Sequence, residues 1–405
     1  MESIRFIHTA DLHLGSPFIG MKGLHKEQWK KLKDSTLDAF DRLVQYALDE
    51  KPDFMLIVGD IYDGEDRSIR AQARFQQGMQ LLADQQIPVI LSYGNHDHLS
   101  GNWTRFELPN NVHAFDESVS QFKLETARGP VTFTGFSYGK RHVSESMVEQ
   151  YPPAQGTDGY HIGMLHGSLD GDATHAVYAP FKKEQLLSKN YDYWALGHIH
   201  KRQELYREPS IIYPGNIQGR HRKESGTKGF YDVTLSKRET TLAFIPTSVV
   251  QFNQVAISME GILHMNELID ACRRELSLVG EAAGTAIVDV MFTEMDAESF
   301  QLLAEIPENE LLETLQESMD ALDHFIWIQG IQFQQAINEA EPSPLAATLV
   351  QTIEGWSTEE WKVVLKDLYR HPKSSRFLEP LADQSVADLQ LAAGQKIRRS
   401  MRAGE

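Results

Sequence analysis

Ile4-Arg5-Phe6-Ile7-His8-Thr9-Ala10-Asp11-Leu12-His13 is an apolar run that ends at two residues able to bind a metal ion. Four later segments have the same form. They are Phe54–Val58 before Gly59-Asp60, Val89–Leu91 before Gly94-Asn95-His96-Asp97, His161–Leu165 before His166-Gly167, and Tyr193–Leu196 before Gly197-His198-Ile199-His200. Each apolar run has the length and composition of a buried strand. Because α/β proteins bind ligands beyond the carboxyl ends of their strands, we expect the five ends to meet at one crevice.

The residues at these strand ends are the ligand types of a two-metal phosphoester hydrolase. The candidate metal ligands are Asp11, His13, Asp60, Asn95, His166, His198 and His200. Carboxylate and imidazole together suit Mn, Fe, Co, Ni or Zn ions, and no candidate is a thiolate, which argues against a closed structural zinc site. One carboxylate can bridge two ions about 3.5–4 Å apart. We expect Asp60 to be that bridge, because it stands alone after Gly59.

The spacing of the ligands adds a geometric expectation. Alternate residues of a strand point to the same side, so Asp11 and His13 are expected to reach one ion together. His198 and His200 have the same spacing. They can both bind one ion, or each can bind a different ion. Asp63, three residues after the expected bridge, is either a partner of the metal ligands or an ordinary turn carboxylate.

The order Asp-x-His, Gly-Asp-x-x-Asp, Gly-Asn-His-Asp, His-Gly, Gly-His-x-His resembles the calcineurin-like metallophosphoesterases. Within them it is most similar to the DNA-repair exonucleases of the SbcD and YhaO type. Three stretches carry this narrower resemblance, namely Thr9–Gly15, Gly59–Asp63 and Tyr213–Arg220. The phosphoprotein-phosphatase branch has Arg and Glu where this chain has Gly64 and Asp97. The resemblance implies an α/β metallophosphoesterase fold, in which helices flank two packed mixed β-sheets.

The resemblance also implies a role for each candidate residue. One ion would be held by Asp11, His13, Asp60 and His200, and the other by Asp60, Asn95, His166 and His198. The expected cofactors are two divalent ions, Mn²⁺ first, with Mg²⁺, Fe²⁺ or Zn²⁺ as alternatives. His96 would lie beside the substrate phosphate and donate a proton or a hydrogen bond to the developing charge. Asp97 would orient the imidazole of His96.

The chain is too long for one core, and its composition changes along its length. We expect a nuclease domain at residues 1–248, an acidic α/β capping domain at 249–338 and a helical C-terminal segment at 345–405. The single cysteine, Cys272, excludes an intramolecular disulfide. The N-terminus lacks the pattern of a signal peptide, and no stretch has the length of a membrane span. We therefore expect a cytoplasmic protein with no membrane contact.

The net charge of −18 looks unfavourable for a DNA-binding protein, but the negative charge is concentrated in one region. Residues 255–345 contain 18 Asp and Glu against two basic residues, Arg273 and Arg274. A basic loop follows the last metal motif, and its residues Arg220, Arg222 and Lys228 are expected to contact DNA phosphates. The alternative is a loop that is basic only for solubility.

These observations predict a two-metal phosphodiesterase that acts in DNA repair as an exonuclease or endonuclease on DNA ends or single strands. The alternative is a phosphodiesterase of a small nucleotide-like substrate. The resemblance implies a partner, a coiled-coil ATPase of the SbcC or YhaN type, and leaves a homodimer open. Residues 358–371 are predicted to form a helix with Trp361, Val364, Leu365 and Leu368 on one face. This face either packs on the catalytic body or docks onto the ATPase.

Overall fold

The computed structural model describes residues 2–370 apart from 19–20, 22, 65–67, 101–105, 157–158, 172–177, 305, 321, 323 and 335–343, and beyond residue 370 only 386, 389–390 and 393–394. Residues 339–343, between the expected capping domain and C-terminal segment, and most of residues 371–405 therefore lie outside the described residues. No helix among the described residues has both the length and the apolar character that crossing a membrane requires.

Among the described residues, six strands form the first sheet in the order β12-β11-β1-β2-β3-β4. The strands β1 (Ile4–Ala10), β2 (Phe54–Val58), β3 (Val89–Ser92) and β4 (Val112–Ala114) are parallel, and β11 (Gly229–Leu235) and β12 (Thr240–Pro246) add an antiparallel edge. Every residue of β2 and β3 is buried. Continuous apolar runs of this kind are typical of parallel strands that are covered on both faces.

The second sheet, within the described part of the chain, has the order β5-β6-β7-β8-β10-β9. Its parallel centre consists of β6 (Gly129–Gly135), β7 (Tyr160–His166), β8 (Tyr193–Gly197) and β10 (Ser210–Tyr213). The antiparallel edges are β5 (Ser120–Thr126) and β9 (Gln203–Tyr206). The sequence does not predict these edge strands, because both are largely solvent-facing and polar.

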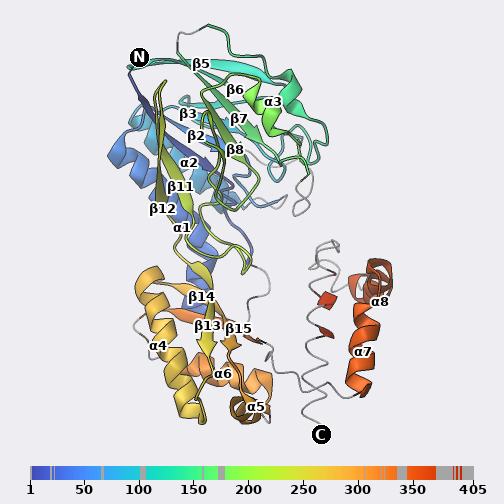
Figure 1. Ribbon diagram of the computed structural model, residues 1–405. Helices are drawn as coiled ribbons and strands as arrows, with labels where there is room; N and C mark the ends of the chain where they lie inside the picture. Colours follow the sequence, from blue (N-terminus) through green and yellow to red (C-terminus); the bar gives the residue numbers. More distant parts are fainter. Residues whose placement is uncertain are drawn as a thin grey trace. The chain divides into compact units, whose positions relative to one another are not determined.

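Helices flank the two sheets (Figure 1). Apolar side chains fill three layers around the sheets. Phe6, Leu56 and Ile162 belong to the layer that joins the facing sheets. On the outer face of the first sheet pack α1 (Lys26–Glu50) and α2 (Ile69–Asp84), and against the second sheet pack α3 (Lys183–Leu187) and the 3₁₀ helix Met147–Gln150. The predicted fold class, two packed mixed sheets flanked by helices, is confirmed.

The acidic region forms a smaller α/β structure. In the described residues its strands pair in the order β13 (Gln251–Ser258), β14 (Ala286–Thr293) and β15 (Ile326–Phe333), and its helices are α4 (Met265–Ala283), α5 (Ala297–Ala304) and α6 (Glu308–Met319). The helices α7 (Pro344–Glu354) and α8 (Thr358–Arg370) follow.

The chain divides into two compact units, and the division runs through the smaller sheet. One unit contains Met1–Gln254, Leu278–Val288 and Asp323–Trp327, and the other contains Val255–Ser277, Asp289–Leu322 and Ile328–Glu405. The domain boundaries expected from sequence, 1–248, 249–338 and 345–405, stay predictions.

Candidate metal centre

The candidate ligands lie at the carboxyl ends of strands from both large sheets. Asp11 and His13 follow β1, Asp60 follows β2, and Asn95, His96 and Asp97 follow β3. From the second sheet, His166 is the last residue of β7, and His198 and His200 follow β8. Since the parallel strands of the two sheets pack across one apolar layer, their ends open at a common place. The structure therefore brings together the residues that the sequence predicts as ligands.

The backbone at the ligands differs from the extended strand that their spacing suggested. Asp11, His13, Asp60 and His198 have φ angles of 52°, 43°, 52° and 99°. Left-handed backbone is uncommon and costly for residues other than glycine, and it concentrates at functional sites. Asp11 and His13 belong to one group of potential ligands although each has left-handed backbone beyond the end of β1, so the alternation of an extended strand does not explain their approach. Their N–H groups donate to the carbonyl oxygens of Gly59 and Asp60 at 3.2 and 3.0 Å.

Glycines beside the ligands permit this close packing. A Cβ on Gly94 would lie 2.3 Å from Oδ1 of Asp60. A Cβ on Gly59 would lie 2.2 Å from Nδ1 of His166, and the φ of Gly59 is +77°. Any larger side chain at these two positions would displace a ligand. The Gly-Asp and Gly-Asn pairs of the sequence are thus needed for space, as well as for the turn.

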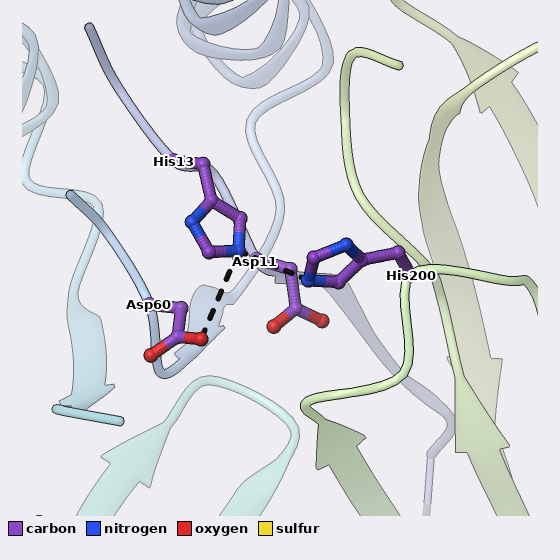
Figure 2. Close-up of side chains that lie close together, drawn as sticks. All are labelled: Asp11, His13, Asp60 and His200. Atoms are coloured by element: carbon purple, nitrogen blue, oxygen red, sulfur yellow. Dashed lines mark hydrogen bonds and ion pairs between the residues drawn. The ribbon is translucent and has the colours of Figure 1, made fainter. Parts of the chain in front are cut away.

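Asp11, His13, Asp60 and His200 form the first group of potential ligand atoms (Figure 2). Nε2 of His13 lies 3.0 Å from Nε2 of His200 and 3.7 Å from Oδ2 of Asp60. Two ligand atoms that bind one ion at about 2.1 Å, at right angles to each other, lie about 3.0 Å apart. The approach of these two ring nitrogens therefore fits a shared divalent ion.

A second group contains Asp60, His166 and His198, and Asn95 lies among them. Nε2 of His166 is 3.4 Å from Oδ2 of Asp60 and 3.0 Å from Oδ1 of Asn95. Nδ1 of His198 is 3.2 Å from the same amide oxygen. Nδ1 of His166 lies 3.1 Å from the carbonyl oxygen of Val58, which leaves its Nε2 for a ligand. Asp60 belongs to both groups, as a bridging carboxylate requires.

Burial and charge give these residues unusual protonation behaviour. Burial is the main reason that the pKa of His13 falls to about 3 and that of His200 to about 4. Both imidazoles are therefore neutral at pH 7, and the neutral form is the one that binds a metal. Burial lowers the pKa of His166 as well, but the Asp60 carboxylate beside it outweighs this and raises the value. In the metal-free chain these two groups form an ion pair, and metal binding must displace a proton from it.

His96 is a partly exposed member of the site. Its side chain is 30% exposed, compared with 22% for His200 and with 0% and 1% for His13 and His166. Its backbone N–H donates to Oδ1 of Asp60 at 2.9 Å. Its ring packs edge to face against the ring of His13, with the ring centroids 5.1 Å apart. His96 also forms, with His13 and Asp63, a third group of potential ligand atoms, so its expected role beside the substrate stays a prediction.

Asp97 and Asp63 take different places around His96. The carboxylate of Asp97 accepts from the N–H of Ile61 at 2.7 Å and of Gly94 at 2.6 Å, and so ties together the loops that follow β2 and β3. Its expected role in orienting His96 stays a prediction. Oδ1 of Asp63 lies 3.9 Å from Nδ1 of His96. Asp63 is thus a partner of the site, the first of the two readings of its position in the sequence.

The basic loop is placed differently from what its sequence suggests. Lys228 is buried, and its Nζ donates to the carbonyl oxygen of His200 at 3.3 Å. Arg220 has a side chain 14% exposed and pairs with Asp63 at 2.8 Å. Of the three predicted DNA contacts, only Arg222 is exposed. The expectation of an exposed basic loop is therefore wrong for Arg220 and Lys228, because each cation fills a partner position in the site wall.

Glu224 is a site residue that the sequence did not indicate. Its carboxylate is 7% exposed, and Oε1 lies 2.6 Å from Nδ1 of His200. Burial disfavours the charged form, but hydrogen bonds from His200 and His221 and the charge of Arg220 hold the pKa of this carboxyl well below its usual range. Glu224 follows three basic residues and belongs to none of the strand-end motifs. Nothing in the local pattern marks it as a partner of a histidine 24 residues earlier.

Buried Asp, Asn and His at converging strand ends, with one carboxylate common to two groups, define the class of metal-dependent phosphoester hydrolases. A family model described as calcineurin-like phosphoesterase matches residues 4–202. The chain belongs to this family of metallophosphoesterases, whose members bind two divalent metal ions.

Individual relatives narrow the comparison. The metallophosphoesterase YhaO of Bacillus subtilis is 33% identical over 409 residues, which cover 99% of each chain. The DNA double-strand break repair protein Mre11 of Aeropyrum pernix is 25% identical over 241 residues, 56% of each chain. The Mre11 protein of Methanocaldococcus jannaschii, which has the same name, is 23% identical over an alignment that covers 66% of this chain and 73% of the Mre11 chain. A dimetal phosphatase structure from Danio rerio aligns at a TM-score of 0.39 and 12% identity, over 61% of this chain and 99% of that one.

Proposed function

We propose that this protein is a two-metal phosphodiesterase that cleaves DNA at ends or in single strands, as a nuclease of DNA repair. The observation that carries the proposal is two groups of mostly buried potential ligands that share Asp60, with the partly exposed His96 beside them. The similarity to two proteins named for DNA double-strand break repair supports DNA as the substrate. The similarity to YhaO over nearly the whole chain adds support for the metallophosphoesterase chemistry alone.

In this proposal Asp11, His13, Asp60 and His200 hold the first ion, and Asp60, Asn95, His166 and His198 hold the second. When bound, two such ions polarise a phosphoryl oxygen and lower the pKa of a water molecule. Mn²⁺ is the ion that we favour. The protein contributes a fixed, mostly buried geometry, so little reorganisation is needed on reaction. His96 donates a hydrogen bond or a proton to the phosphate oxygen on which charge develops.

Exposed cations beside the site favour a DNA substrate over a small one. Lys201 and Arg202 directly follow the ligand His200 and are exposed, and the guanidinium of Arg202 lies over the ring of Phe244 at 3.8 Å. Arg222 is exposed as well. We propose that Lys201, Arg202 and Arg222 contact DNA phosphates, in place of the half-buried Arg220 and the buried Lys228. Contacts of this kind make binding sensitive to salt.

One set of assays tests this function. The protein with Mn²⁺ is given end-labelled duplex DNA, single-stranded DNA and bis-p-nitrophenyl phosphate, each over a range of salt concentrations. A DNA nuclease cleaves at least one DNA, and its cleavage at low enzyme concentration falls steeply with salt while hydrolysis of the small diester does not. His96→Ala is the control for a contaminating nuclease. Turnover of the small diester alone, without DNA cleavage, would refute the proposal and favour a small nucleotide-like substrate.

We also propose that α8 docks onto a coiled-coil ATPase. Trp361 is buried, but Val364 and Leu368 on the same predicted face are 57% and 52% exposed. An apolar helical face left in water is a common partner surface. Val364→Asp together with Leu368→Asp should abolish co-purification with the ATPase and leave phosphodiesterase activity unchanged. Val363→Asp, which lies on the other side of the helix and is 70% exposed, is the matched control. Loss of binding in the control as well would contradict the assigned face.

A further inference from the structure

Behind the two histidines of the first ion site lie two carboxylates. Nδ1 of His200 is 2.6 Å from Oε1 of Glu224, and Nδ1 of His13 is 3.4 Å from Oδ1 of Asp63. The other ring nitrogens of the two histidines, both Nε2, approach each other at 3.0 Å. Each imidazole is thus placed between a carboxylate on one side and the expected ion on the other.

One guanidinium connects the two carboxylates. Arg220 donates from Nη1 to Oδ1 of Asp63 at 2.8 Å, and its Nη2 lies 3.6 Å from Oε1 of Glu224. The side chains of Asp63, Arg220 and Glu224 are 16%, 14% and 7% exposed. In such partial burial, charged hydrogen bonds are stronger and more directional than they are on the open surface.

Further hydrogen bonds hold each carboxylate in place. Oε2 of Glu224 accepts from the N–H of Arg220 and from Nδ2 of Asn216, both at 2.8 Å. Oδ2 of Asp63 accepts from Oγ of Ser16 at 2.7 Å. The carboxylates are therefore fixed before an ion binds.

One contact competes with this arrangement. Nη2 of Arg220 lies 3.2 Å from Nδ1 of His200 and could donate to it. The distance from the same Nδ1 to Glu224 is shorter, at 2.6 Å, and a carboxylate only accepts hydrogen bonds. The hydrogen is therefore on Nδ1 of His200, and the lone pair is on Nε2, where the ion is expected.

The geometry points to Glu224 as a positioning residue that fixes the tautomer and orientation of His200 toward the first ion, with Arg220 joining it to Asp63 beside His13. This inference rests on the proposed assignment of both histidines to one ion. The second site is built otherwise, since Nδ1 of His166 faces the backbone oxygen of Val58 at 3.1 Å. Outer carboxylates of this kind raise metal affinity by about 10- to 100-fold. Substitution of Glu224 should therefore weaken binding of the first ion and leave binding of the second unchanged.

The test is Mn²⁺ binding by calorimetry and metal analysis, together with the melting temperature of the metal-free protein. Wild type should bind two ions. Glu224→Gln should weaken one of them by about 10- to 100-fold and leave the other unchanged. It should also lower the metal-free melting temperature, because its amide NH₂ would face donors that now bind the carboxylate. The matched control is Glu50→Gln, which removes the charge of a carboxylate that pairs with Arg5 at 2.7 Å outside the site. It should change neither ion.

Double variants distinguish positioning from a simple loss of negative charge. Glu224→Gln should have no further effect in a His200→Ala background, and its full effect in a His198→Ala background. A loss that persists without His200, equal weakening of both ions, or unchanged affinity with a lower melting temperature would each overturn the inference. If Glu224→Gln does not fold, Glu224→Asp, which keeps the charge but shortens the reach to Nδ1 of His200, is compared in the same backgrounds. A wild type that binds fewer than two ions would overturn the ligand assignment as well.

Discussion

The strand ends of the two large sheets and the acidic region from residue 255 to 345 are both rich in carboxylates, but they use them in opposite ways. The acidic region holds 18 Asp and Glu, yet within the described residues none of them joins a group of three or more side chains that could hold an ion. All such groups among the described residues lie at the strand ends of the large sheets. Carboxylate number therefore does not make a metal site. What makes it is buried convergence, which forces ionisable groups together and surrounds them with partners.

The largest effect is expected from substitution of Asp60, the carboxylate that is expected to bridge the two ions. Asp60→Ala should lose both ions and essentially all phosphodiesterase activity, because one carboxylate belongs to both ligand groups. Metal analysis after dialysis and an assay with bis-p-nitrophenyl phosphate measure the two losses. Asp49→Ala, an exposed carboxylate of α1, is the control and should retain both ions. Retention of one ion by Asp60→Ala would show that the bridge is misassigned.

A smaller loss separates chemistry from metal binding. His96→Ala should keep both ions and reduce turnover by about 100-fold or more, as expected when a general acid or charge stabiliser is removed. Metal content and kcat are measured on the same preparation. If this variant lost an ion, His96 would be a ligand, and the distinction between it and the buried histidines would fail.

Charge reversal next to the site should act on DNA alone. Lys201→Glu and Arg222→Glu should each weaken DNA binding and reduce its salt dependence by about one unit, the value for one lost phosphate contact. Hydrolysis of bis-p-nitrophenyl phosphate should stay at the wild-type rate. Arg220→Gln, from the same loop, should instead weaken the first ion, because its guanidinium is paired with Asp63. If Lys201→Glu and Arg222→Glu kept the wild-type salt slope, the assignment of these two cations to DNA contacts would be contradicted.

The smallest effect is expected in the acidic region. Glu310, Glu313 and Glu317 are exposed and lie three and four residues apart on α6. Like charges at these spacings destabilise a helix by about 0.2–0.5 kcal/mol per pair. Glu313→Lys should therefore raise the stability slightly in urea unfolding followed by circular dichroism, without any change in Mn²⁺ binding. A loss of Mn²⁺ from this variant would show that the acidic region does bind metal.

Local sequence patterns predicted much of the fold and of the ligand set. The apolar runs before Asp11, Asp60, Asn95, His166 and His198 correspond to β1, β2, β3, β7 and β8. These features follow from periodicity and from residue type at a strand end, which act over a few residues. The short edge strands β4 and β9 were missed because they carry no continuous apolar run.

The tertiary structure alone decided which residues surround the ligands. Glu224 pairs with His200 and Arg220 with Asp63, the latter across 157 residues, and neither pairing leaves a local signal. The same packing turned Lys228 from an expected surface cation into a buried donor. Burial makes an unpaired charge costly, so a charge drawn into the site must find a partner there. Sequence thus determined which residues can bind metal, and the packing of the two sheets determined which distant charges hold them in place.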